Sequence, residues 1–133
     1  DIAKLMQLYL NDGTYAYKRY IGGNTVSEFS KCQFCDLGNY RALGFDRPSK
    51  PGDPNGNSAP SAPAESFGHS GFTGTYTWID PVNDIVYVFL SNRVNPTREN
   101  PKLSRLNTRT NVLQVVYDAM GKAKAGNPVS IQQ

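Results

Sequence analysis

The sequence predicts an α+β fold, in which a three-stranded antiparallel sheet at about 66–92 packs against a long C-terminal helix and follows N-terminal helices. Two segments, 74–80 and 85–90, are rich in β-branched and aromatic residues and flank the turn-like run Pro81-Val-Asn-Asp84. Apolar residues recur at steps of three and four from Leu103 to Met120, and Gly121 follows where a helix C-cap is typical. Residues 1–10 show the same helical spacing before Asn11-Asp12-Gly13.

The chain before the sheet is expected to be helical and then irregular. A second helix is predicted from Asn24 or Thr25 to about Lys31, because a capping residue stands three or four positions before Glu28. Residues 40–45 favour a short strand. From 46 to 66 the chain carries five of its nine prolines, so neither a helix nor a strand ladder is expected there. Such long loops are often functional or disordered, and both interpretations stay open.

These segments are expected to form one partial domain over 1–133. It consists of a helical segment at 1–45, a Pro/Gly-rich loop at 46–66, a β-sheet at 67–92 and a C-terminal helix at 103–121. Phe67 to Gly71 is the expected third strand, which reverses at Phe72-Thr73-Gly74. The nearly continuous apolar run at 85–90 predicts a strand that is buried on both faces.

Charge and cysteine content exclude several classes of function. The 14 basic and 11 acidic residues are interspersed, which is typical of a solvated surface and not of a nucleic-acid-binding face. No run approaches the ~20 apolar residues of a membrane span. Cys32-Gln-Phe-Cys35 is compatible with a redox pair, half a zinc site or loop cysteines that are disulfide-bonded in an exported protein. Because His69 is the one histidine and no third cysteine exists, we expect no metal and no cofactor.

The run Phe67-Gly-His-Ser-Gly-Phe-Thr-Gly-Thr75 carries a family resemblance, supported by Trp78-Ile-Asp-Pro81, Val88 to Arg93 and the helix after them. It resembles the third motif of the serine β-lactamase, penicillin-binding-protein and esterase superfamily, a strand that bears Lys-Thr-Gly or His-Ser-Gly. Residues 41–46 and 92–96 are similar to modules of this superfamily fused behind family-three glycoside hydrolases. The resemblance covers most of 1–120. It implies the C-terminal part of a β-lactamase/transpeptidase-like fold, in a bacterial protein of the periplasm or cell surface.

The candidate site residues are His69, Ser70, Gly71 and Phe72. Side chains alternate along a strand, so adjacent His69 and Ser70 point to opposite faces and are not a nucleophile–base pair. The resemblance implies that His69 is the basic catalytic group of the cleft, that Ser70 and Gly71 line the substrate, and that the Phe72 N–H helps to form an oxyanion hole. The alternative is a His69 that is held by a local hydrogen bond and has no catalytic duty. A neutral imidazole favours ester-like substrates.

The first motif of the superfamily, Ser-x-x-Lys, does not occur in the sequence: no lysine has serine three positions before it. Tyr9-Leu-Asn11 matches the second motif only by coincidence, because Tyr9 belongs to the apolar spacing of the first helix. We therefore expect a C-terminal fragment of a serine hydrolase, acting on esters, β-lactams or peptidoglycan-type amides in the complete protein and inactive alone. The alternative is a non-catalytic module for cell-wall or carbohydrate binding or for assembly. We also expect a homodimer through the exposed apolar edge of strand 85–90.

Overall fold

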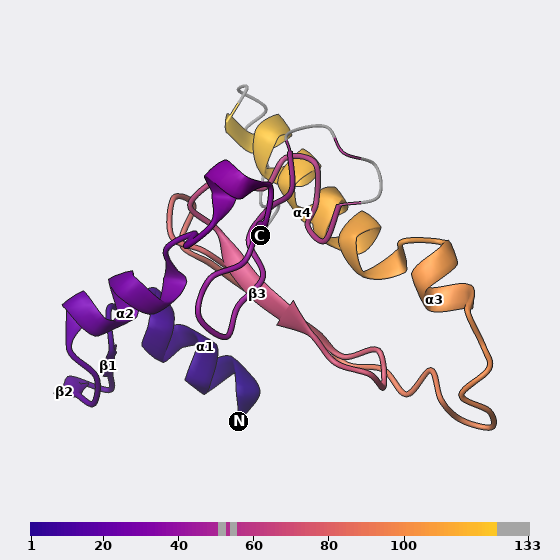
Figure 1. Cartoon of the computed structure of the whole chain (residues 1–133), viewed down its shortest axis with the longest axis horizontal. Helices are drawn as coiled ribbons and strands as arrows, with labels where there is room; N and C mark the ends of the chain where they lie inside the picture. Colours follow the sequence, from indigo (N-terminus) through magenta and orange to yellow (C-terminus); the bar gives the residue numbers. More distant parts are fainter. Residues whose placement is uncertain (51–52, 54–55, 125–133) are drawn as a thin grey trace, which may run out of the picture.

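A computed structural model describes residues 1–50, 53 and 56–124 of the chain. Its main sheet has the order β3-β4-β5 and is antiparallel throughout. Helices α1 and α4 lie on opposite sides of this sheet, and the arrow of β3 runs between them in Figure 1. The α+β fold class is thus confirmed. The elements are α1 (Ile2–Leu10), β1 (Thr14–Tyr15), β2 (Lys18–Arg19), α2 (Gly23–Ser30), η1 (Cys35–Leu37), β3 (Phe67–Ser70), β4 (Tyr76–Asp80), β5 (Ile85–Phe89), α3 (Lys102–Arg105) and α4 (Thr108–Lys124).

The core is built on both faces of the central strand β4. On one face Trp78 packs with Leu113 and Tyr117 of α4. On the other face Ile79 packs with Met6 of α1 and with Phe67 of β3. These two clusters are separated by the sheet itself, so the molecule has three layers.

The expectation that strand 85–90 is buried on both faces is wrong. Every residue of β5 is only half-buried, whereas every residue of β4 is buried. The reason is topological, because β5 is an edge strand and β4 has a strand on each side and a helix on each face. The strand that is buried on both faces is therefore β4, which has the more polar sequence.

Three local predictions are also corrected. The cap of α2 is Gly22, with no side-chain capping bond, and Asn24 and Thr25 lie inside the helix. The predicted continuous helix 103–121 is two helices, α3 and α4, separated at Leu106 and Asn107, where Asn107 has a left-handed φ of 47°. Residues 40–45 form no strand, because the backbone turns back on itself and makes only an isolated bridge from Arg41 to Asp46.

The described part of loop 46–66 is packed onto the sheet. Ala59 is buried in the same cluster as Trp78, and the Ser61 N–H donates to Gln114 Oε1 of α4 over 2.9 Å. The Arg47 guanidinium donates to the carbonyl oxygens of Ser30, Ala64 and Glu65 at 2.5–3.0 Å. Burial lowers the pKa of Arg47, although the charge of Glu65 opposes this effect. Arg47 thus ties both ends of the loop to the end of α2.

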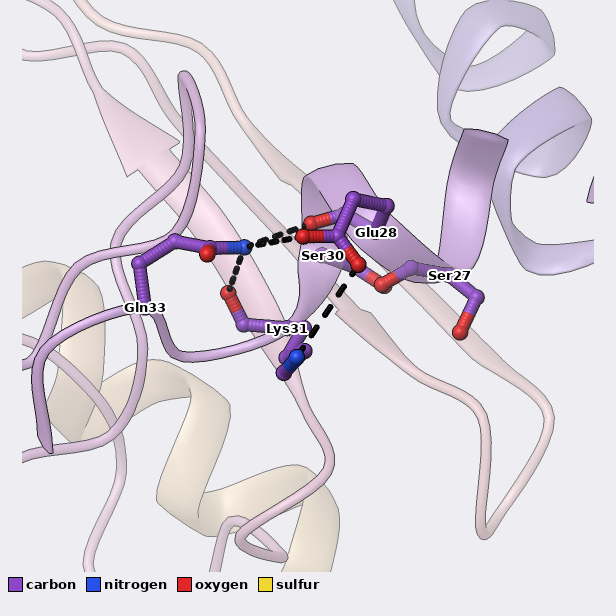
Figure 2. Close-up of polar contacts among 5 residues, drawn as sticks. All are labelled: Ser27, Glu28, Ser30, Lys31 and Gln33. Atoms are coloured by element: carbon purple, nitrogen blue, oxygen red, sulfur yellow. Dashed lines mark hydrogen bonds and ion pairs between the residues drawn. The ribbon is translucent and has the colours of Figure 1, made fainter. Parts of the chain in front are cut away.

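Side-chain bonds to the backbone organise the end of α2, as Figure 2 shows. Gln33 turns back along the helix, and its Nε2 donates to the Glu28 carbonyl oxygen over 2.8 Å. The chain then enters a loop that the Cys32–Cys35 disulfide closes, with the two Cα atoms 5.7 Å apart. Among the described residues, no group of three or more His, Cys, Asp or Glu side chains could hold a metal ion.

Asp80 joins the β4-β5 turn to α4. Its carboxylate is fully buried and accepts four hydrogen bonds, from the Val82 N–H, the Asn83 N–H, Asn83 Nδ2 and the Tyr117 hydroxyl. Burial raises the pKa of Tyr117, and the hydrogen bond to Asp80 and its negative charge raise it further. Burial likewise raises the pKa of Tyr76, and to a smaller extent that of Tyr87.

The raised tyrosine pKa values predict loss of stability at alkaline pH. Their stabilising contribution is present below the ordinary value of about 10 and is lost as the pH rises through the folded-state values. We expect Tyr117→Phe to lower the free energy of unfolding by about 1.5 kcal/mol at neutral pH, because one hydrogen bond to a buried carboxylate is lost. We also expect it to make the decline above about pH 10 less steep. Urea unfolding followed by Trp78 fluorescence measures both, and equal slopes for the two proteins would contradict the assignment.

Candidate active site

The candidate site lies on β3, at the edge of the sheet opposite β5. Within the described residues, a bridge between Asp46 and Gly68 is the pairing on the outer side of β3. The Asp46 N–H donates to the Gly68 carbonyl oxygen over 2.7 Å, and the Gly68 N–H returns a bond of 3.0 Å. Glycine is required at 68 because a Cβ there would clash with the Thr77 carbonyl oxygen and with Trp78. This close approach fixes the register of the strand that carries His69.

His69 is exposed and has two polar neighbours. Its Nδ1 lies 2.8 Å from the carbonyl oxygen of Ser70. Its Nε2 lies 3.5 Å from Nη2 of Arg41, a residue 28 positions earlier in the chain. Arg41 also donates from Nη1 to Asp46 Oδ1 over 2.6 Å. The imidazole therefore belongs to a polar network that reaches the strand from a separate turn.

Ser70 points to the other face of the strand, toward α4. It lines a cavity of ≈ 200 Å³ together with Tyr76, Arg109 and Thr110. The strand register agrees, because Ser70 pairs with Tyr76 while His69 pairs with Thr77. His69 and Ser70 are therefore not brought together as a nucleophile and its base.

Gly71 and Phe72 form the turn after the strand. The Gly71 N–H donates to the Thr75 carbonyl oxygen over 2.6 Å. The Phe72 ring is 69% exposed and lies 4.7 Å from the guanidinium of Arg93, whose Nε donates to the Phe72 carbonyl oxygen over 2.7 Å. The Phe72 N–H makes no hydrogen bond to any residue that the structure describes. A donor with no partner in this part of the protein is therefore held in place beside an exposed edge.

A cavity of ≈ 290 Å³ lies elsewhere, between the disulfide loop and loop 46–66. Its lining includes Cys32, Tyr40 and Lys50, and none of the four predicted site residues contributes to it. The positive charge of Arg47 in its wall is directed at backbone carbonyl groups. This cavity is consequently separate from the chemistry of β3.

The motif on β3 predicts no role for Arg41, Asp46 or Arg93. The sequence offered only a weak signal for them, because all three lie in stretches that resemble the superfamily without belonging to its third motif. Their contacts to β3 and to the turn after it cross 21 to 28 residues of chain, which no spacing rule covers. The structure therefore adds two guanidinium groups to the candidate site.

The sequence is similar to those of known proteins. The sequence model of the family described as Beta-lactamase matches residues 13–111. A putative D-alanyl-D-alanine carboxypeptidase of Salmonella agona (strain SL483) is 36% identical over 110 residues, which cover 78% of this chain and 23% of that protein. The protein of the same description from Salmonella gallinarum (strain 287/91 / NCTC 13346) gives the same values, and the one from Salmonella typhi is 34% identical over the same length and shares.

The chain belongs to the Beta-lactamase family. This confirms the resemblance to the serine β-lactamase and penicillin-binding-protein superfamily and its partial β-lactamase-like fold. The chain spans about a quarter of the length of these curated relatives. In the described residues no helix is both long and apolar enough to cross a membrane.

Two glycines of the site should respond differently to alanine. Gly68→Ala forces a Cβ into the backbone of β4, so we expect a loss of about 3 kcal/mol in the free energy of unfolding. Gly71→Ala brings its Cβ no closer than 3.6 Å to Thr75, so we expect a change within about 0.5 kcal/mol. Urea unfolding of the two variants measures the difference. Equal stabilities would show that the register at Gly68 is not constrained as described.

Proposed function

We propose that this chain supplies the substrate-side wall of the cleft of a serine hydrolase that cleaves amide or ester bonds at D-alanyl groups. The proposal rests on the exposed edge of β3, with His69 and a Phe72 N–H that has no hydrogen-bond partner among the described residues. The relatives bear the description putative D-alanyl-D-alanine carboxypeptidase, which favours a peptide amide substrate. A disulfide is typical of oxidising compartments, where peptidoglycan-type substrates also occur.

In this proposal His69 is the basic group of the cleft. A neutral imidazole donates a hydrogen bond from one ring nitrogen and accepts one at the other. It can therefore help to move a proton when an acyl group is transferred. It holds no permanent charge, unlike the lysine at the same motif position in other members. Ser70 and Gly71 would contact the substrate, and the small Gly71 allows an extended substrate to lie close to the strand.

The Phe72 N–H is proposed as one donor of the oxyanion hole. A backbone donor held in a rigid turn stabilises negative charge on a carbonyl oxygen without moving first. Arg93 donates a hydrogen bond to the Phe72 carbonyl oxygen, and its guanidinium lies over the Phe72 ring. These two contacts restrain Phe72 and therefore the direction of its N–H. The second donor of such a hole is the N–H of the nucleophile, and Ser-x-x-Lys does not occur in this sequence. Half of an oxyanion hole is the expected contribution of this chain.

We predict that the isolated chain has no hydrolytic activity. Without the nucleophile and its base it should turn over neither nitrocefin nor p-nitrophenyl esters, and a fluorophosphonate probe should label no serine. Absorbance assays and intact-mass spectrometry measure the two outcomes. Turnover that a covalent serine reagent abolishes would overturn this prediction.

A chimera tests the proposed roles directly. The matched segment of the Salmonella agona relative is replaced by the matched segment of this chain, and acylation by a fluorescent penicillin is compared with that of the unaltered relative. We expect His69→Ala to slow acylation by about 100-fold. Ser70→Ala should have a smaller effect. A chimera that is acylated equally fast with and without His69 would contradict the assignment.

The second candidate function is a non-catalytic module for cell-wall or carbohydrate binding or for assembly. It predicts binding of the isolated chain to peptidoglycan sacculi without any acylation in the chimera. Co-sedimentation with sacculi separates this candidate from the hydrolase.

We also propose that the isolated chain forms a homodimer through the edge of β5. Leu90, directly after this strand, is 71% exposed, and edge strands that are apolar tend to pair. We expect twice the chain mass by light scattering, and a monomer for Leu90→Lys. Val82→Lys is the matched control, because Val82 is 58% exposed but lies in the turn before β5. A wild-type chain that is monomeric at high concentration would exclude the dimer.

A further inference from the structure

The two contacts of His69 determine which nitrogen carries its proton. The Ser70 carbonyl oxygen can only accept a hydrogen bond, so the Nδ1 that lies 2.8 Å away must donate. The Arg41 guanidinium can only donate, so the Nε2 that lies 3.5 Å from Nη2 must accept. Both contacts are satisfied together by one form of the ring, the neutral Nδ1–H tautomer. The Nε2–H tautomer would lose the first bond and place two N–H groups against each other at the second.

Arg41 is itself oriented by Asp46. Its Nη1 donates to Asp46 Oδ1 over 2.6 Å, and the side chain of Asp46 is only 14% exposed. A tight turn brings the two residues together, since the Ala42 N–H donates to the Phe45 carbonyl oxygen over 2.9 Å. The guanidinium therefore presents Nη2 to the ring while Nη1 is held.

The turn at 41–46 is hydrogen-bonded to Gly68, the residue before His69. Asp46 and Gly68 exchange two backbone hydrogen bonds, of 2.7 and 3.0 Å. A closed set of contacts therefore runs from β3 to the Asp46 backbone, from the Asp46 carboxylate to the Arg41 guanidinium, and from there back to the imidazole of His69. Movement of Arg41 relative to His69 requires at least one of these bonds to break.

We propose that Arg41 is a positioning residue, which holds the His69 imidazole as the Nδ1–H tautomer with Nε2 as acceptor and places a permanent positive charge beside it. The catalytic meaning of this state rests on the proposed function, whereas the tautomer itself rests only on the contacts above. Guanidinium groups stay charged at every pH at which proteins fold. The charge that a lysine would carry on the strand is thus supplied here by the neighbouring turn.

Since His69 is the one histidine of the sequence, NMR can read its tautomer without ambiguity. Long-range ¹H–¹⁵N spectra of the ¹⁵N-labelled chain are recorded at about pH 9, where an ordinary imidazole is neutral. We expect the protonated-nitrogen shift at Nδ1 and the unprotonated one at Nε2. A dominant Nε2–H form in the wild-type chain overturns the proposal.

Variants separate positioning from folding. Arg41→Met keeps the aliphatic stem and removes the donor to Nε2, so we expect the Nδ1–H fraction to fall, although the bond to the Ser70 carbonyl oxygen retains part of it. Arg41→Lys restores a donor and should recover part of the Nδ1–H population. Asp46→Asn keeps the backbone bonds to Gly68 and should give an intermediate mixture. Arg98→Met is the matched control, because Arg98 is exposed and, among the residues that the structure describes, its side chain pairs only with Glu99.

The outcomes distinguish this proposal from the proposed function. Backbone ¹H–¹⁵N spectra establish that Arg41→Met is folded, and an unchanged tautomer in that folded variant overturns the positioning role. If instead the tautomer depends on Arg41 but the chimera is acylated normally without His69, the proposed function fails and the positioning stands. If both hold, Arg41→Met in the chimera should slow acylation by about 10-fold and Arg98→Met should leave it unchanged.

Discussion

The burial of β4 on both faces is the constraint on which the other elements depend. Trp78 and Ile79 are almost completely buried, one against α4 and the other against α1. Removing a buried aromatic side chain of this kind costs about 3–5 kcal/mol, which is a large share of the stability of a small domain. The two helices are held in place by these contacts, and β3 is held by its register with the same strand.

This constraint reaches the candidate site through one glycine. Gly68 pairs with Trp78, and the space there is too small for a Cβ. The next residue, His69, must then point to the face opposite Trp78, where the turn at 41–46 approaches. The direction of the imidazole is therefore a consequence of how tightly β3 packs on β4. Beyond Gly68 no described residue pairs with the outer edge of β3, and under the proposed function a substrate would lie along this edge.

Local periodicity was sufficient to predict the helices and strands that bury one apolar face. Residues 1–10 and 108–120 repeat apolar side chains at helical spacing, and 85–90 is apolar throughout, so these elements were predicted from the sequence. The burial of β4 on both faces was not predicted, because Thr77 and Asp80 are polar. The buried Asp80 carboxylate is satisfied in part by the Tyr117 hydroxyl, and a hydropathy pattern carries no information on a hydrogen-bond partner 37 residues away. The break at Asn107 was missed since the apolar spacing continues across it.

In the candidate site, too, neighbouring residues were predicted from the sequence, whereas residues that reach the site from distant parts of the chain were not. The motif located His69, Ser70, Gly71 and Phe72, which are consecutive, and alternation along a strand correctly separated the first two. The two guanidinium groups come from outside the motif: Arg41 from a turn before loop 46–66, and Arg93 from the segment after β5. Each is anchored before it reaches the strand, Arg41 by Asp46 and Arg93 by the carbonyl oxygens of Arg98 and Asn100.

Anchored cations differ from a lysine on the strand in what they can do. A lysine ammonium on a flexible stem can move with the substrate, whereas these guanidinium groups have part of their hydrogen-bonding capacity committed to the protein. Under the proposed function, Arg41 would act on the substrate through His69, and Arg93 through the direction of the Phe72 N–H. Positive charge would then line the wall of the proposed cleft, with its donors held in fixed directions. In such a wall, the geometry of the backbone and of one neutral imidazole determines which substrate oxygen is stabilised.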